Sequence, residues 1–276
     1  MQQIALAILL YPGLALAIIL GVAFRWLAEG RAPQPRLRVP PLSADGLASL
    51  ASILLAALAL VLLPWPLHPA AGQAWVGSPL ALWIALEGAF LAPLLPGLLA
   101  PSALAARAAA REAQIGAAGR FVIWLSVGTA LWTAAGWATW ELPGRALAAL
   151  AGLLALPAAI GTGLFGAERS LSAAGAEEGL DEATVDLLRF ARIVRGAALL
   201  AVLIVASLPG PESALPLRPP VALALIGALF LAIGLALRRI AMALPRLTLP
   251  DALRWCWWRA LPLAVAGLVY LVIRNA

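Results

Sequence analysis

Cysteine, histidine and charged residues are scarce in this sequence of 276 residues, and lysine is absent. The single cysteine, Cys256, excludes a disulfide bond within the chain. Zinc, haem and iron–sulfur sites need several Cys or His ligands, and the one histidine, His68, cannot complete such a set. Because His68 lies in a proline-rich turn, it is a poor candidate for a Ser-His-Asp triad. We therefore expect no metal site and assign no catalytic residue.

Charged residues make up only 12% of the chain, whereas apolar residues make up 63%. An average soluble domain has about 25% charged residues, which cover its surface. This composition excludes a soluble globular protein, a disordered chain and an ordinary nucleic-acid-binding domain. The net charge of +6 comes from 19 arginines, and their distribution follows membrane topology. The chain is expected to be an integral membrane protein.

Eight apolar runs of about 18 or more residues predict transmembrane helices. They cover residues 4–24, 47–67, 74–100, 121–140, 146–167, 185–208, 219–237 and 256–273. The sixth run is the least regular, because three arginines fall in its first half. The prediction is an all-α, polytopic membrane helix bundle of about eight transmembrane helices, forming a single transmembrane domain over residues 1–276.

Arginine is distributed unevenly between the predicted connections. Sixteen of the 19 arginines lie in the connections after spans one, three, five and seven, when those at 189, 192 and 195 are counted with the fifth. By the positive-inside rule, these connections are cytoplasmic and the N and C termini both lie outside.

Reporter fusions test this orientation. A fusion at His68, in the second connection, is expected to report the outside, and a fusion at Pro245, in the seventh, the cytoplasm. Activity on the same side for both would contradict the predicted spans.

Glu87 is the one carboxylate deep inside a predicted span, since Asp186, at the start of the sixth, is counted with the fifth connection. If the third span enters from the outside near Val76, a rise of 1.5 Å per residue places Glu87 roughly 16 Å deep, near the middle of a ~30 Å hydrocarbon core. A lone carboxylate at this depth is expected to face the bundle interior or water, which suits a proton carrier. The alternative is a permanently protonated glutamate that hydrogen-bonds to a neighbouring backbone group.

The connection after the fifth span is acidic, with six carboxylates within residues 168–186. A solvated acidic loop is one interpretation. The other starts from Arg189, Arg192 and Arg195, whose spacing of three places them on one helix face. Arg195 would lie about 10 Å inside the membrane, too deep for its side chain to reach the surface fully. This depth favours a polar, hydrated pocket lined by arginines and acids.

Several stretches resemble the membrane subunit that complex I (NADH:quinone oxidoreductase, subunit 1) shares with formate hydrogenlyase and other membrane-bound hydrogenases. Residues 38–41 (Arg-Val-Pro-Pro) and 44–47 (Ala-Asp-Gly-Leu) are similar to the stretch after the first helix of that family. Residues 244–255 (Leu-Pro-Arg-Leu-Thr-Leu-Pro-Asp-Ala-Leu-Arg-Trp) closely resemble its seventh connection. Further similarities lie at residues 78–88, 101–104, 110–113, 167–169 and 181–182.

The resemblance implies a membrane-embedded anchoring and ion-coupling subunit of a complex I-like or hydrogenase-like oxidoreductase in a prokaryotic plasma (inner) membrane. Its partners would be hydrophilic iron–sulfur subunits and antiporter-like membrane subunits. This chain alone would contain no redox centre and bind no cofactor. The cofactor would be a quinone at an interface with another subunit. Residues 170–175 depart from the family pattern. The alternative that the chain belongs to a hydrogenase-like complex without a quinone therefore stays open.

The family's functional positions are carried over residue by residue. The ion or proton path would contain Glu87, Glu168, Asp181, Glu182 and Arg195. The quinone chamber or docking face would contain Arg36, Arg38, Asp45, Arg189, Arg192 and Arg246.

Two other functions remain as alternatives: a stand-alone transporter for a small solute or ion, and a structural scaffold subunit of a membrane complex. The sequence shows no internal repeat of the kind common in transporters. A scaffold has no use for a carboxylate at the membrane midplane.

Overall fold

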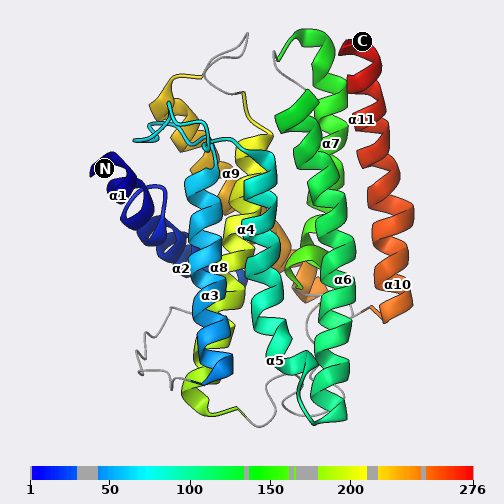
Figure 1. Ribbon diagram of the computed structural model, residues 1–276. Helices are drawn as coiled ribbons and strands as arrows, with labels where there is room; N and C mark the ends of the chain where they lie inside the picture. The colour runs from blue at the N-terminus through cyan, green and yellow to red at the C-terminus, as the bar shows by residue number, and fades with distance from the viewer. Residues whose placement is uncertain are drawn as a thin grey trace.

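A computed structural model of the protein describes residues 2–29, 43–133, 137–161, 165, 180–209, 217–243 and 247–275. The regular structure in these ranges is helical, which confirms the all-α prediction (Figure 1). The α-helices are α1 (Gln2–Leu9), α2 (Leu14–Glu29), α3 (Ala44–Leu62), α4 (Pro79–Leu91), α5 (Leu95–Leu98), α6 (Ala103–Gly128), α7 (Leu142–Ile160), α8 (Glu182–Ala206), α9 (Pro219–Ala243), α10 (Leu249–Arg254) and α11 (Leu261–Asn275). Short 3-10 or π-helical turns extend several of them: η1 (Ala92–Leu94), η2 (Thr129–Thr133), η3 (Thr139–Glu141) and η6 (Trp255–Ala260).

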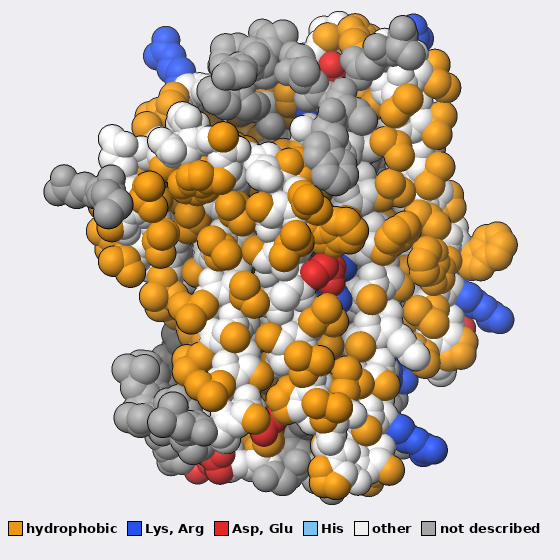
Figure 2. All heavy atoms as spheres, viewed as in Figure 1, with side chains coloured by type: hydrophobic (Ala, Val, Ile, Leu, Met, Phe, Trp, Pro, Cys, Tyr) orange, Lys and Arg blue, Asp and Glu red, His pale blue; other side chains and the backbone are white. Residues whose placement is uncertain are grey.

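Seven stretches of the described chain are long and apolar enough to cross a membrane. They are Gln3–Ala28, Ala44–Leu62, Pro79–Leu98, Ala103–Leu131, Thr139–Ile160, Pro219–Ala243 and Leu249–Arg274. Each matches one predicted span. The remaining predicted span, the sixth, corresponds to α8, whose first half carries three arginines. The protein is therefore a polytopic helical bundle with eight long helical segments. Apolar side chains cover most of the face in Figure 2, as expected for a surface in a membrane.

The start of the fourth predicted span is wrong. The apolar run begins at residue 121, but α6 begins at Ala103, with Ser102 accepting a hydrogen bond from the Ala105 amide as its N-cap. Charged residues end an apolar run without ending a helix, and alanine-rich residues 103–119 favour helix strongly. As a result, Glu112 and Arg120, counted as part of a cytoplasmic connection, lie within this helix.

Helix α8 is the centre of the bundle. It packs against α2, α3, α4, α7 and α9. From Val194 to Ala206 every residue of α8 is buried. The helices α6, α7 and α11 pack against one another at one side of the bundle (Figure 1). Any polar group on the inner face of α6 or α8 is therefore held away from lipid.

Glycine allows α6 and α7 to cross closely. A Cβ atom added at Gly119 would lie 2.5 Å from the Ala159 backbone nitrogen and 3.0 Å from the Ala155 carbonyl oxygen. Backbone atoms cannot move aside as a flexible side chain can. The crossing therefore depends on the missing side chain.

Gly119→Ala is expected to destabilise the protein by about 1–3 kcal/mol, because α6 and α7 must separate to make room for the methyl group. The control is Gly227→Ala in α9, where an added Cβ meets no described atom within 4 Å. Thermal unfolding of both variants in mild detergent measures the difference. Equal midpoints would contradict the close crossing.

Candidate functional site

Glu87 is not isolated, contrary to the sequence-based prediction. The Arg120 Nε atom on α6 donates to both carboxylate oxygens of Glu87 at 3.0 Å. Trp124, one turn further along α6, donates its indole N–H to Glu87 Oε1 at 3.1 Å. These contacts fix the carboxylate between α4 and α6, with an opposite charge beside it.

A second ion pair joins α6 to α8. Glu112 accepts a hydrogen bond from Arg195 Nη2 at 2.6 Å on one oxygen and from Arg192 Nη2 at 2.9 Å on the other. Arg195 also donates from Nη1 to the Phe90 carbonyl oxygen on α4 at 3.0 Å. The sequence predicts a pocket lined by Arg189, Arg192 and Arg195 with acids of the fifth connection. In the structure, Arg192 and Arg195 pair with Glu112 of α6, and Arg189 is exposed.

Phe90 connects the two ion pairs. Its ring lies under both guanidinium groups, with the central carbons of Arg120 and Arg195 at 4.5 and 4.7 Å from the ring centroid. Such stacking on an aromatic face stabilises a buried cation. We call Glu87, Phe90, Glu112, Arg120, Arg192 and Arg195 the ion-pair cluster. Its three guanidinium groups face two carboxylates.

A small cavity lies within the ion-pair cluster. Its lining includes Phe90, Glu112, Arg120 and Arg195, and its volume of about 10 Å³ gives room for one water molecule. Gly116 also lines it, and a Cβ there would lie 2.7 Å from Arg120 Nη1. Glycine at this position therefore makes room for the guanidinium group.

The buried N–H donors Arg120 Nη2 and Arg195 Nε have no hydrogen-bond partner among the described residues. Both side chains are only 2% exposed. An unsatisfied buried donor costs about 1–3 kcal/mol, and more on a charged group. Because both arginines line the cavity, a water molecule in it is the natural partner for these donors.

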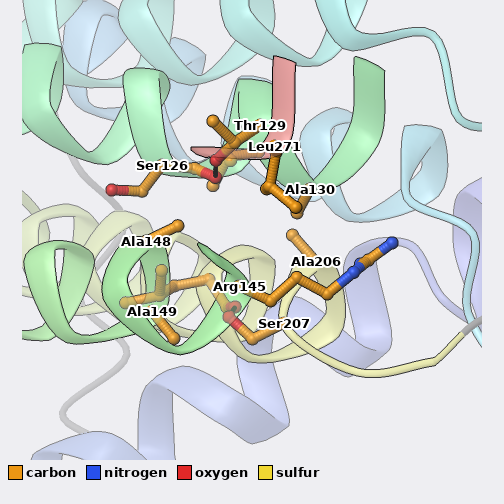
Figure 3. A pocket seen from close by; sticks show the side chains of 11 residues that line it. Ser126, Thr129, Ala130, Arg145, Ala148, Ala149, Ala206, Ser207 and Leu271 are labelled. Atoms are coloured by element: carbon orange, nitrogen blue, oxygen red, sulfur yellow. Dashed lines mark hydrogen bonds between the residues drawn. The ribbon is translucent and has the colours of Figure 1, made fainter. Parts of the chain in front are cut away.

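A third buried ion pair lies elsewhere, at the start of α7. Arg145 donates from Nε and Nη2 to Glu141 Oε2, at 3.1 and 3.0 Å, and its guanidinium group stacks on Trp137. Nearby, a cavity also about 10 Å³ in volume separates Ser126 of α6 and Thr129 of η2 from α7 and Ser207 (Figure 3). This outer pair was not predicted, because both residues were assigned to connections.

Four further predicted residues that the structure describes lie on α3, at the N-cap of α8 or in the first half of α8. Asp45 is in the first turn of α3, and Glu182 and Arg189 are exposed on α8. Asp181 is the N-cap of α8: hydrogen bonds from the Thr184 hydroxyl and the Thr184 amide hold the pKa of its carboxyl group below the usual range. Its place in an ion path stays a prediction. Four predicted residues lie outside the described ranges: Arg36, Arg38, Glu168 and Arg246.

Sequence reasoning missed Glu112 and Arg120 as members of the site. The signal was their spacing of eight residues, which places both on one face of a helix together with Gly116. Recognising it required treating residues 103–120 as helical. The pairing across three helices has no signature in the sequence.

Comparison with known proteins gives a structural match but no sequence match. No protein-family model and no curated protein matches the chain. Its structure is similar to a chain of the membrane-bound sulfane sulfur reductase (MBS), an archaeal respiratory membrane complex, with a TM-score of 0.68. This protein therefore has the fold of that subunit of the MBS complex. The match covers 98% of this chain and 100% of the MBS chain, at 15% sequence identity, and at this identity it establishes the fold alone.

Proposed function

We propose that this protein is the membrane subunit that anchors a complex I-like or hydrogenase-like oxidoreductase and couples its electron transfer to proton or ion movement. The observation that carries the proposal is the ion-pair cluster, which holds five buried or largely buried charged side chains across α4, α6 and α8. The overall fold, which is that of a chain in the MBS complex, supports the same class.

The energetic cost of the cluster favours a functional role. Moving charges out of water is expensive, and a buried ion pair often stabilises a protein less than apolar side chains of the same size. A scaffold subunit would gain nothing from five such groups. Ionisable residues inside membrane proteins characteristically mark ion paths and proton relays.

The geometry suits proton transfer along the bundle. Glu112 and Arg120 are eight residues apart on α6, which corresponds to about 12 Å along the helix. A water molecule in the cavity would hydrogen-bond to the guanidinium groups that pair with Glu112 and Glu87. Because a guanidinium group only donates and keeps its protons, a proton would pass between the two carboxylates through water and not through the arginines. In this scheme the two carboxylates take up and release the proton, and the arginines set the charge around them.

The two cavities described above do not fit a quinone, because each has room for about one water molecule. We assign no quinone site to these residues. A quinone would have to bind at an interface with another subunit, against the cytoplasmic side of the chain.

The docking face for the iron–sulfur subunits is proposed on that side. Arg111, near the start of α6, donates to the Leu247 carbonyl oxygen at 2.9 Å and so ties the seventh connection to the bundle. This connection resembles the complex I family most closely. Arg189, which is exposed on α8, is proposed to add positive charge to the docking face, for an acidic partner.

Gentle extraction tests the association. In mild detergent at low salt, the tagged protein is expected to co-purify with a soluble partner that contains iron–sulfur clusters, detected by iron content and electron paramagnetic resonance. Raising the salt should weaken the association, because exposed charges are screened. A monomer without partners under low-salt extraction would contradict the proposed function.

A further inference from the structure

The ion pair between Glu87 and Arg120 reaches the outer surface of the bundle on one side. The Glu87 side chain is 25% exposed, whereas that of Arg120 is 2% exposed. The carboxylate is therefore the outer member of the pair. Figure 2 shows acidic atoms beside basic atoms at mid-height of an apolar face, where α4 and α6 run side by side in Figure 1.

The depth of Glu87 excludes bulk water and lipid headgroups as its surroundings. It is eight residues from the start of α4, about 12 Å along the helix, within the span Pro79–Leu98. Large apolar side chains are exposed around it on α4 and α6. They are Leu80, Trp83, Ile84, Leu91 and Phe121. This face lies in the hydrocarbon region of a bilayer.

Lipid chains cannot complete the hydrogen bonding of this carboxylate. A carboxylate has about four acceptor positions, and Glu87 accepts three hydrogen bonds, two on Oε1 and one on Oε2. The side chain of Glu87 is 25% exposed at this face, so the acceptor position that Arg120 and Trp124 leave open needs a further donor, which hydrocarbon does not contain. Polar groups that face lipid without a partner are strongly unfavourable.

We propose that the face of α4 and α6 around Glu87 docks a transmembrane helix of another subunit, one that carries a hydrogen-bond donor at the depth of Glu87. The proposal rests on the proposed function in requiring a membrane partner. A quinone does not fit, because its carbonyl groups accept hydrogen bonds. In a two-fold contact between copies of this chain, a Glu87 near the axis would meet the Glu87 carboxylate of the other copy, which is an acceptor and not a donor.

Site-specific photo-crosslinking in native membranes tests the docking. The crosslinking amino acid replaces Ile84, which is exposed one turn from Glu87. The control position is Leu231, exposed near the middle of α9. Ile84 is expected to capture one membrane protein, in a transmembrane segment with a Ser, Thr, Tyr, Asn, Gln, Lys or Arg within one helical turn of the crosslinked residue. Leu231 should not capture the same protein.

Two charge-neutral double variants make the test specific. Glu87→Leu/Arg120→Leu removes every hydrogen-bonding group of the pair without leaving a lone charge, and should reduce capture at Ile84 on the order of tenfold. Glu87→Gln/Arg120→Gln keeps polar side chains of similar size and should retain capture. Replacing the donor of the captured helix with leucine should reduce capture to the same extent.

Three results would overturn the proposal: adducts of lipid alone at Ile84, a crosslink between two copies of this chain, or capture that the leucine double variant leaves unchanged. The crosslinking experiment measures assembly and not proton coupling. A variant that keeps capture but loses proton coupling leaves the docking surface intact. Normal coupling in every variant, with capture lost in the leucine double variant, counts against the proposed function and supports the docking surface.

Discussion

Glu112→Leu is expected to lower the free energy of unfolding by about 3–5 kcal/mol. Glu112 is the described carboxylate that pairs with both Arg192 and Arg195, and Arg195 is only 2% exposed. Removing one member of a buried ion pair leaves the other charge uncompensated in a medium of low polarity. Unfolding by sodium dodecyl sulfate in mixed micelles, followed by circular dichroism, measures the change.

Two further variants show that the loss comes from unpaired charge. Glu112→Leu/Arg195→Leu removes the most buried cation with its partner, and should recover much of the stability, because Arg192 is 19% exposed and can extend toward water. Glu182→Gln removes an exposed carboxylate at the start of α8, and should cost no more than about 1 kcal/mol. If Glu112→Leu cost as little as Glu182→Gln, the buried pair would not be formed.

The helices were predictable from the sequence because the membrane imposes a simple rule. A chain in hydrocarbon satisfies its backbone groups within each helix, so long apolar runs identify the spans. All eight predicted runs match long helices. The rule misplaces the start of α6. Alanine and glycine around Glu112 and Arg120 continue the helix where charged residues interrupt the apolar run.

The candidate site was only half predictable, for a related reason. Depth along a span follows from counting residues, so the sequence predicts that Glu87 and Arg195 lie well inside their helices, and both do lie within long helices. Which side chains meet depends on how helices pack, and packing joins Glu87 to Arg120, 33 residues away, and Arg195 to Glu112, 83 residues away. Without these partners, Glu87 had the appearance of an isolated carboxylate.

Glu87 provides the most direct test of coupling. If it carries a proton, Glu87→Gln should abolish most of the proton movement that accompanies electron transfer, because an amide cannot ionise. Glu87→Asp keeps an ionisable group with a shorter reach and should retain part of the coupling. The measurement is acidification by sealed membrane vesicles during electron transfer, with the amount of assembled complex checked in the same preparation.

The pairing with Arg120 adds the control that separates a relay from a structural ion pair. Glu87→Gln alone leaves Arg120 without a counter-charge, so a loss of coupling in that variant has two explanations. Glu87→Gln/Arg120→Gln removes both charges together. If the glutamate only balances the arginine, this double variant should regain normal coupling, because no unpaired charge remains. If Glu87 takes up and releases the proton, the double variant should assemble and still fail to couple, since no ionisable group stands at that position. Full coupling in the double variant would therefore remove Glu87 from the path, whereas an assembled but uncoupled complex would place it there.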